Sequence, residues 1–300
     1  MNDLYNRWNR RKGRKVAVAV ENAYKLSAEI VCQEKKSLEG MEAKRWQKAN
    51  KVTIIVIPGE YDTVEIVLDS LDLEYETRDP GDFDELALNN NDIVIINCPG
   101  KGFSDAGLAT LKNHVAGGGL VITTDWALKH VVQRAFPGFI EHNGLETSTP
   151  FVDVRVTDTI VDYLKDLVAP GTTPRWWLEE GSYPIRILNS NVRRILTSQE
   201  MKSEYQDPTI ACIIHFGKGQ VMHMTSHLFL ENAAPLDSEE KSALPDLLQN
   251  WQIDQKTRSR ILTAIESGMN YKAIEAAYVL ENLLVRVLEN HVKTHAKKAR

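Results

Sequence analysis

The sequence lacks the features that usually identify disulfide-bonded or zinc-binding proteins. Its 300 residues contain three cysteines, Cys32, Cys98 and Cys212, and none of them belongs to a CxxC or CxxH pair. A zinc cage needs clustered thiols or imidazoles, and a disulfide framework needs more cysteines than these. We therefore expect reduced thiols, no metal site and a location in a bacterial cytoplasm.

Long apolar runs and nucleotide motifs are also missing. A membrane-spanning helix needs roughly 20 apolar residues, and neither such a run nor an apolar secretory core is present, so we expect no membrane span and no secretion. The sequence contains no GxxxxGK[ST] and no GxGxxG, the motifs in which glycine amides hold phosphates. We predict no cofactor.

The charge is small but uneven. The net charge is −5, from 36 basic and 41 acidic side chains, whereas the first 15 and the last ten residues are strongly basic. Basic ends can contact nucleic acid, an anionic lipid surface or an acidic partner. Solvated chain ends are the more common explanation, and we favour it.

What is present is an alternation of strands and helices between Asp92 and Ala135. Ile93 to Ile96 and Leu120 to Ile122 are unbroken aliphatic runs, typical of strands buried on both faces of a parallel sheet. Between them, apolar residues recur at helical spacing up to a triple glycine at 117–119. The segment predicts a right-handed βαβ crossover, whose ligands lie at the carboxyl ends of the strands.

Similar patterns flank this segment. Val52 to Ile57 predicts a strand, and Asp62 with Glu65 predicts a capped helix after it. Further helices are predicted around residues 15–48, 82–88, 126–136, 160–168, 238–250 and 257–291, and further strands over 73–77, 151–156, 185–188, 194–196, 209–216 and 220–224. The last two strands are joined by the hairpin signal Gly217-Lys218-Gly219.

These patterns predict an α/β fold. It is a flavodoxin-like three-layer sandwich with a mostly parallel central sheet, added antiparallel strands, and helical extensions at both ends. We divide the chain into an extension over 1–50, an α/β domain over 51–250 and a helical tail over 251–300.

Two turns carry candidate site residues. Cys98-Pro99-Gly100-Lys101-Gly102 follows a buried strand, so its amides and Lys101 could hold an anion, although a structural turn is the more common explanation. Cys98 could be a nucleophile if a histidine approached it, but a small buried cysteine is favoured. We predict ligand contacts from Glu60, Tyr61, Gly100, Lys101 and Trp126.

The second turn begins with Asp125, where this architecture places a nucleophile elbow. A strained elbow needs small neighbours, whereas bulky Trp126 follows, so we interpret Asp125 as a helix N-cap rather than a catalytic carboxylate. His130 faces either the same side or solvent. His227 follows the late strand that contains His223 and is better placed for a polar or catalytic role than that histidine.

The stretch from Val52 to Ala135 resembles the class I glutamine amidotransferase-like superfamily, with Ser104-Asp105-Ala106-Gly107-Leu108 and Val115-Ala116-Gly117-Gly118-Gly119 as its motifs. Gly217 to Val221 and Met224 to His227 are similar to the closing strand and histidine of the trehalose-utilisation (ThuA-like) branch. Glutaminases of the superfamily carry a cysteine elbow, GxCxGxQ, and a later His-x-Glu. Here Thr124-Asp125-Trp126 occupies the elbow, and no glutamate stands two residues after a candidate histidine.

The sequence thus favours a non-catalytic amidotransferase-like domain that binds or assembles, because without the elbow thiolate no acyl-enzyme forms by the glutaminase route. A hydrolase or sugar-modifying enzyme that uses Cys98, Asp125, His130 and His227 is the alternative.

Residues 258–277 are similar to a helix-turn-helix unit, so nucleic-acid binding by the tail is a second alternative. A helical hairpin docked on the core is favoured, because a DNA-reading helix would carry more basic or amide side chains. The apolar stripe of residues 280–288 also suggests a protein partner or self-association through the terminal helices.

Overall fold

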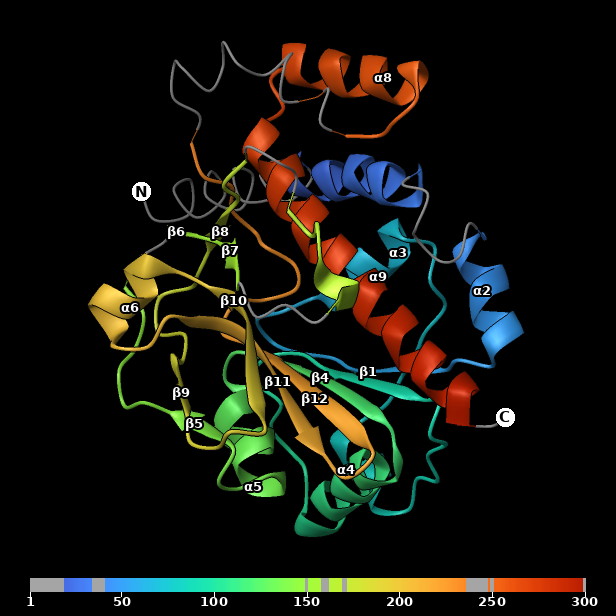
Figure 1. The fold of residues 1–300 in the computed structure, drawn as a ribbon, viewed down its shortest axis with the longest axis vertical. Coiled ribbons are helices and arrows are strands. Elements are labelled where there is room, and N and C mark those ends of the chain that lie inside the picture. Colours follow the sequence, from blue (N-terminus) through green and yellow to red (C-terminus); the bar gives the residue numbers. More distant parts are fainter. Residues whose placement is uncertain are drawn as a thin grey trace, which may run out of the picture.

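A computed structural model describes residues 19–33, 41–148, 151–157, 162–168, 172–235, 248 and 251–298. Its centre is an eight-stranded sheet with the order β2-β1-β3-β4-β12-β11-β10-β7 (Figure 1). Helices cover both faces of this sheet, so the predicted three-layer α/β sandwich is confirmed. No helix in the described ranges is long and apolar enough to cross a membrane.

The parallel half of the sheet holds the residues with unbroken aliphatic runs. Its strands are β2 (Glu76–Thr77), β1 (Ile54–Ile57), β3 (Ile93–Ile96), β4 (Leu120–Thr124) and β12 (Gly219–Met224). Every residue of β1, β3 and β4 is buried, because helices lie on both sides. Their carboxyl ends therefore meet at one edge of the molecule.

Antiparallel strands complete the other half. β12 pairs with β11 (Thr209–Phe216), β11 with β10 (Val192–Thr197), and β10 with β7 (Arg155–Val156). The predicted hairpin turn joins β11 to β12, and its Gly217 has a φ of 59°. Two small sheets lie outside the main one, β5 (Ile140–His142) with β9 (Ile185–Ile187) and β6 (Phe151–Asp153) with β8 (Arg175–Trp177).

One face of the sheet is covered by η2 (Pro80–Asp84), α4 (Asp105–Gly117), η3 (Leu128–Val132) and α5 (Gln133–Ala135). Ser104 caps α4, since its hydroxyl accepts a hydrogen bond from the amide of Gly107 at 3.0 Å. Gly118, with a φ of 133°, ends the helix, as the triple glycine predicts.

The opposite face carries residues 19–33, α2 (Ala43–Asn50), α3 (Val64–Ser70) and the long α9 (Tyr271–Lys298) (Figure 1). Nearly all of α9 between Tyr271 and Val292 is buried, including the apolar stripe of 280–288. This stripe therefore packs inside the chain, and the predicted self-association surface is not available on it.

The tail is a helical hairpin docked on the core. α8 (Gln255–Glu266) is followed by Gly268, whose φ is 99°, and α9 begins three residues after this glycine. Between Tyr271 and Val292 the burial of α9 leaves no free face for a nucleic-acid groove, so the structure has the docked hairpin that its side chains predict.

Several predicted elements differ from the structure. The strand over 73–77 shrinks to β2, the helix over 82–88 is the earlier 3-10 turn η2, and the strand over 151–156 divides between β6 and β7 in two different sheets. α6 (Gln199–Tyr205) was not predicted. Short segments are decided by the neighbours they pair with, which local sequence patterns do not encode.

Two further predicted helices fall partly or almost wholly outside the described residues. The segment 160–168 contains only the short 3-10 helix η4 (Asp162–Leu164) among its described residues. The predicted helix over 238–250 lies outside the described residues except for Leu248.

Candidate functional site

Three side chains from separate loops meet at the carboxyl ends of the parallel strands. Cys98 follows β3, Asp125 follows β4 directly, and His227 follows β12. Cys98 Sγ lies 3.8 Å from Asp125 Oδ2, and His227 Nε2 lies 3.5 Å from the same oxygen. We call these residues the buried triad, because all three are buried and one ligand-type atom of each lies within 4.8 Å of the other two.

Asp125 occupies an elbow between β4 and the next helix. Its φ is 43°, in the left-handed region that non-glycine residues adopt rarely. Its carboxylate accepts hydrogen bonds from Ser182 Oγ at 3.1 Å and from the Tyr183 amide at 2.8 Å. The prediction that Asp125 caps the following helix is therefore wrong, since its side chain turns toward the loop after β8 and Ala127 is the N-cap of η3.

His227 stands between two carboxylates. Glu179 Oε2 lies 3.8 Å from His227 Nε2, and neither ring nitrogen has a hydrogen-bond partner within the described chain. Burial by itself lowers the pKa of His227, but the carboxylates of Asp62 and Asp125 outweigh it and hold this pKa well above its usual value. Burial raises the pKa of Glu179.

Cys98 is enclosed rather than presented to solvent. Its amide donates to Thr124 Oγ1 at 3.1 Å, and its carbonyl accepts from the amides of Glu60 and Tyr61 at 3.0 and 3.3 Å. Burial is the main cause that raises the pKa of its thiol, and the Asp125 carboxylate adds to it, while His227 opposes both. The thiol is the favoured form in the absence of a cation.

Asp62 fixes the loops around the triad. It was predicted to cap α3, but Thr63 is the N-cap and no side-chain capping bond forms. The Asp62 carboxylate instead accepts from Thr124 Oγ1 at 2.8 Å and from the amides of Leu228 and Phe229 at 3.1 and 3.2 Å. It thereby joins the ends of β1, β4 and β12 and holds the backbone next to His227.

An aromatic group lies beside the triad, and we call it the aromatic rim. It consists of Tyr61, Trp126 and Tyr183 with Lys101 and Lys129. Trp126 stacks on Tyr183 with ring centroids 5.6 Å apart and meets Tyr61 edge-on at 5.2 Å. Lys129 Nζ lies 4.5 Å from the centre of the Tyr183 ring, and Lys101 Nζ lies 5.9 Å from that of Trp126.

The remaining predicted site residues have other surroundings. Gly100 is buried, and a Cβ atom there would lie 2.9 Å from that of Ala127, so the glycine permits close packing. Glu60 is exposed, and only its amide is bonded to the loop of Cys98. His130 is not a member of the triad; burial and then the nearby Lys101 and Arg134 lower its pKa.

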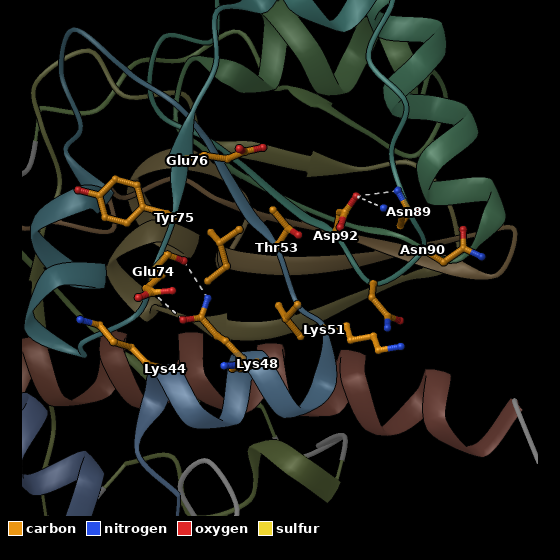
Figure 2. A pocket seen from close by; sticks show the side chains of 14 residues that line it. Lys44, Lys48, Lys51, Thr53, Glu74, Tyr75, Glu76, Asn89, Asn90 and Asp92 are labelled. Atoms are coloured by element: carbon orange, nitrogen blue, oxygen red, sulfur yellow. Dashed lines mark hydrogen bonds between the residues drawn. The ribbon is translucent and has the colours of Figure 1, made fainter.

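A large hollow lies elsewhere. It measures about 1020 Å³ and lies at the amino ends of β1 and β3 beside α2 (Figure 2). Figure 2 shows Lys44 of α2 near Glu74, with Lys48 of α2 and its C-cap Lys51 further along the same hollow. It lies at the opposite end of the strands from the triad, whereas ligands of such sheets bind at the carboxyl ends of the strands.

The sequence did not point to Glu179, Ser182 and Tyr183. They belong to one loop after β8, whose glycine turn at Gly181 has a φ of 84°. The loop is held next to the triad by a hydrogen bond, because Trp126, the residue after Asp125, donates its Nε1 hydrogen to the Gly181 carbonyl at 2.8 Å. The pair of acids before a glycine was the only local signal, and such pairs are common on solvated turns.

Comparisons with known proteins yield likeness in structure alone. No protein-family profile matches the chain, and a search of curated proteins finds no match. Among solved structures, a β-galactosidase from Rahnella is 12% identical with a TM-score of 0.36, covering 73% of this chain and 31% of its own. The chain thus spans about three tenths of the length of the β-galactosidases it matches.

Two smaller neighbours match over most of their own length. A protein from Bacteroides uniformis that is described as ThuA-like is 13% identical, with a TM-score of 0.40 and coverage of 58% of this chain and 80% of its own. A cytoplasmic protein from Salmonella typhimurium is 11% identical, with a TM-score of 0.39 and coverage of 72% and 98%. At these values the likeness assigns neither family nor activity, and membership of the ThuA-like branch stays a prediction.

Proposed function

We propose that this protein is a non-catalytic, amidotransferase-like binding component that holds a planar, negatively charged group against the aromatic rim. The observation that carries the proposal is the state of Asp125 at the elbow. Its side chain is 3% exposed, and both of its oxygens accept hydrogen bonds from the loop after β8. A nucleophile must be presented to its substrate, whereas this carboxylate is buried and held toward the loop after β8.

The aromatic rim supplies what a binding role needs. Tyr61 is 43% exposed, and Lys101 and Lys129 are exposed above the rings of Trp126 and Tyr183. Aromatic faces bind planar groups, and the two ammonium groups favour an anion. A bacterial cytoplasmic partner that carries such a group would make the protein part of an assembly, with α8 as the part of the tail that keeps an exposed face.

The binding role can be tested with 4-nitrophenyl phosphate, an aromatic anion whose hydrolysis is visible. We expect saturable binding by calorimetry without release of nitrophenol, and weakening by about tenfold in Trp126→Ala. Lys129→Met should weaken binding about two- to fivefold. Lys112→Met is the matched control, since Lys112 is a residue of α4 that lies over the ring of Phe216 and is not part of the aromatic rim. Equal binding by all variants, or hydrolysis by the wild type, would contradict the proposal.

The second candidate is a cysteine hydrolase, favoured by the meeting of Cys98, His227 and Asp125. An activated thiolate would react quickly with iodoacetamide. We expect the opposite in chelator-treated protein: exposed Cys32 should be alkylated at least about tenfold faster than buried Cys98. Peptide mass spectrometry over time measures both rates. Preferential labelling of Cys98 would support the hydrolase and overturn the binding role.

A further inference from the structure

The buried triad has an unusual composition for a site without a cation. A thiol, a carboxylate and an imidazole face one another, and the carboxylate of Glu179 approaches the same imidazole nitrogen. Three of these four groups are acids, and a bound divalent cation would compensate more anionic charge than the single imidazole does. Soft sulfur together with imidazole and carboxylate oxygen is the donor set of zinc and related transition metals rather than of magnesium or calcium.

The spacing of the donor atoms agrees with one shared ion. Tetrahedral zinc, with bonds of about 2.0 to 2.3 Å, separates its ligand atoms by about 3.3 to 3.6 Å. The structure places His227 Nε2 3.5 Å from Asp125 Oδ2, Cys98 Sγ 3.8 Å from that oxygen, and Glu179 Oε2 3.8 Å from the nitrogen. The three triad atoms therefore already lie near the spacing of ligands around one ion, whereas Glu179, which lies close only to the imidazole nitrogen, would have to move inward to join them.

A second observation points to a missing partner. The His227 side chain is 2% exposed, and its Nε2 lies 3.5 and 3.8 Å from two carboxylate oxygens without a close hydrogen bond to either. Buried polar atoms are nearly always satisfied, so an unsatisfied nitrogen among acids is where a cation would bind. The neighbouring hydroxyls of Thr225 and Ser226 are also buried without a partner among the described residues.

We propose that Cys98, Asp125 and His227, with Glu179 as the fourth ligand, form a binding site for a single divalent transition-metal ion, zinc by preference. The loops of β3, β4, β12 and β8 each supply one ligand. Ser182 and the Tyr183 amide hold the Asp125 carboxylate, as outer groups commonly orient metal ligands. Glu179, with a side chain 27% exposed, is the ligand that an entering ion meets first.

The site was not visible in the sequence, because its ligands stand 27, 54 and 48 residues apart along the chain (98 to 125, 125 to 179, 179 to 227). Short CxxC or HxxxH spacings reveal only sites whose ligands share one loop or helix. The inference does not rest on the proposed binding role, since metal content and binding of 4-nitrophenyl phosphate are measured separately.

The experiment uses the full chain, stripped with a chelator and then titrated with Co²⁺ and with Zn²⁺. We expect one ion per chain, a thiolate-to-cobalt charge-transfer band in the near ultraviolet, and displacement of cobalt by zinc. Cys98→Ser should lose this band. Glu179→Gln, at a partly exposed position, should keep the fold and weaken affinity by about 10- to 100-fold.

Two cysteine variants serve as controls. Cys32→Ser and Cys212→Ser remove the exposed thiol and the other buried thiol and should leave both the stoichiometry and the band unchanged. The proposal is overturned by a wild-type chain that binds neither ion at micromolar concentration. It is equally overturned if Glu179→Gln binds as tightly as the wild type and the band disappears in Cys32→Ser or Cys212→Ser. If Cys98→Ser does not fold by circular dichroism, the Glu179→Gln affinity and the two controls decide.

Discussion

Replacing Asp62 by alanine should lower the free energy of unfolding by about 3 to 5 kcal/mol. The Asp62 side chain is buried, and its carboxylate accepts from Thr124 Oγ1 and from the amides of Thr63, Leu228 and Phe229. Alanine leaves these donors without an acceptor inside the protein. Buried donors that lose a charged acceptor bear a full desolvation penalty, which is larger than the net value of an ordinary hydrogen bond.

Urea denaturation followed by circular dichroism measures this loss. Glu60→Ala is the matched control, because Glu60 lies in the same loop with an exposed side chain, and we expect it to change stability by less than about 0.5 kcal/mol. A loss of under 1 kcal/mol for Asp62→Ala would show that the loop amides find other acceptors, and the role of Asp62 as the link between strand ends would be withdrawn.

The stability of the wild type should fall as the pH rises from about 5 to 8. Glu281 on α9 is fully buried, and burial raises the pKa of its carboxyl to about 8, although hydrogen bonds from the Ser27 and Ser70 hydroxyls oppose this. The folded chain therefore keeps a proton that the unfolded chain releases near its ordinary pKa of about 4.3. Because the native state binds more protons across this interval, stability is greatest below it and decreases through it.

The size of the decrease follows from the same shift. One pKa unit corresponds to about 1.4 kcal/mol, and the interval from pH 5 to pH 8 covers about three units between the unfolded and folded pKa values, so the loss across it is about 4 kcal/mol, as an order of magnitude. Glu281→Gln has no proton to lose and can still donate to one serine and accept from the other. We expect this variant to show a smaller pH dependence than the wild type, because the raised pKa of His227 remains, and to exceed the wild type in stability at pH 8.

Unfolding midpoints in urea at several pH values test this expectation. Glu266→Gln on α8 is the control, since its side chain is exposed, and it should follow the wild-type curve. If the wild type and Glu281→Gln lose stability in parallel over the interval, another group dominates the titration and the assignment to Glu281 fails.

Most of the fold could be predicted from the sequence because the patterns that indicate it involve only a few adjacent residues. The aliphatic runs of β1, β3 and β4, the serine cap of α4 and the glycine that ends it each depend on a few adjacent residues. Such patterns encode burial on two faces and backbone conformation directly. Short elements such as β2 and β7 were misjudged, since each exists only through pairing with a neighbouring strand.

The candidate site was readable only in part. The positions of Cys98, Asp125 and His227 at strand ends placed them on one edge, because parallel strands end together. Their orientations were not readable: both Asp62 and Asp125 look like helix caps in sequence, and both side chains instead bond to loops that arrive from elsewhere in the chain. A cap and a long-range acceptor use the same residue type, so composition does not separate them.

By itself, the sequence determined the layered α/β architecture and the absence of a glutaminase elbow, since periodicity and a missing cysteine are properties of contiguous residues. Only the tertiary structure decided that the terminal helices belong to the core, and that Glu179 and His227 meet next to Asp125. Contacts between residues far apart in the chain depend on how loops close over the sheet. That closure is set by burial and by hydrogen bonding across the whole molecule.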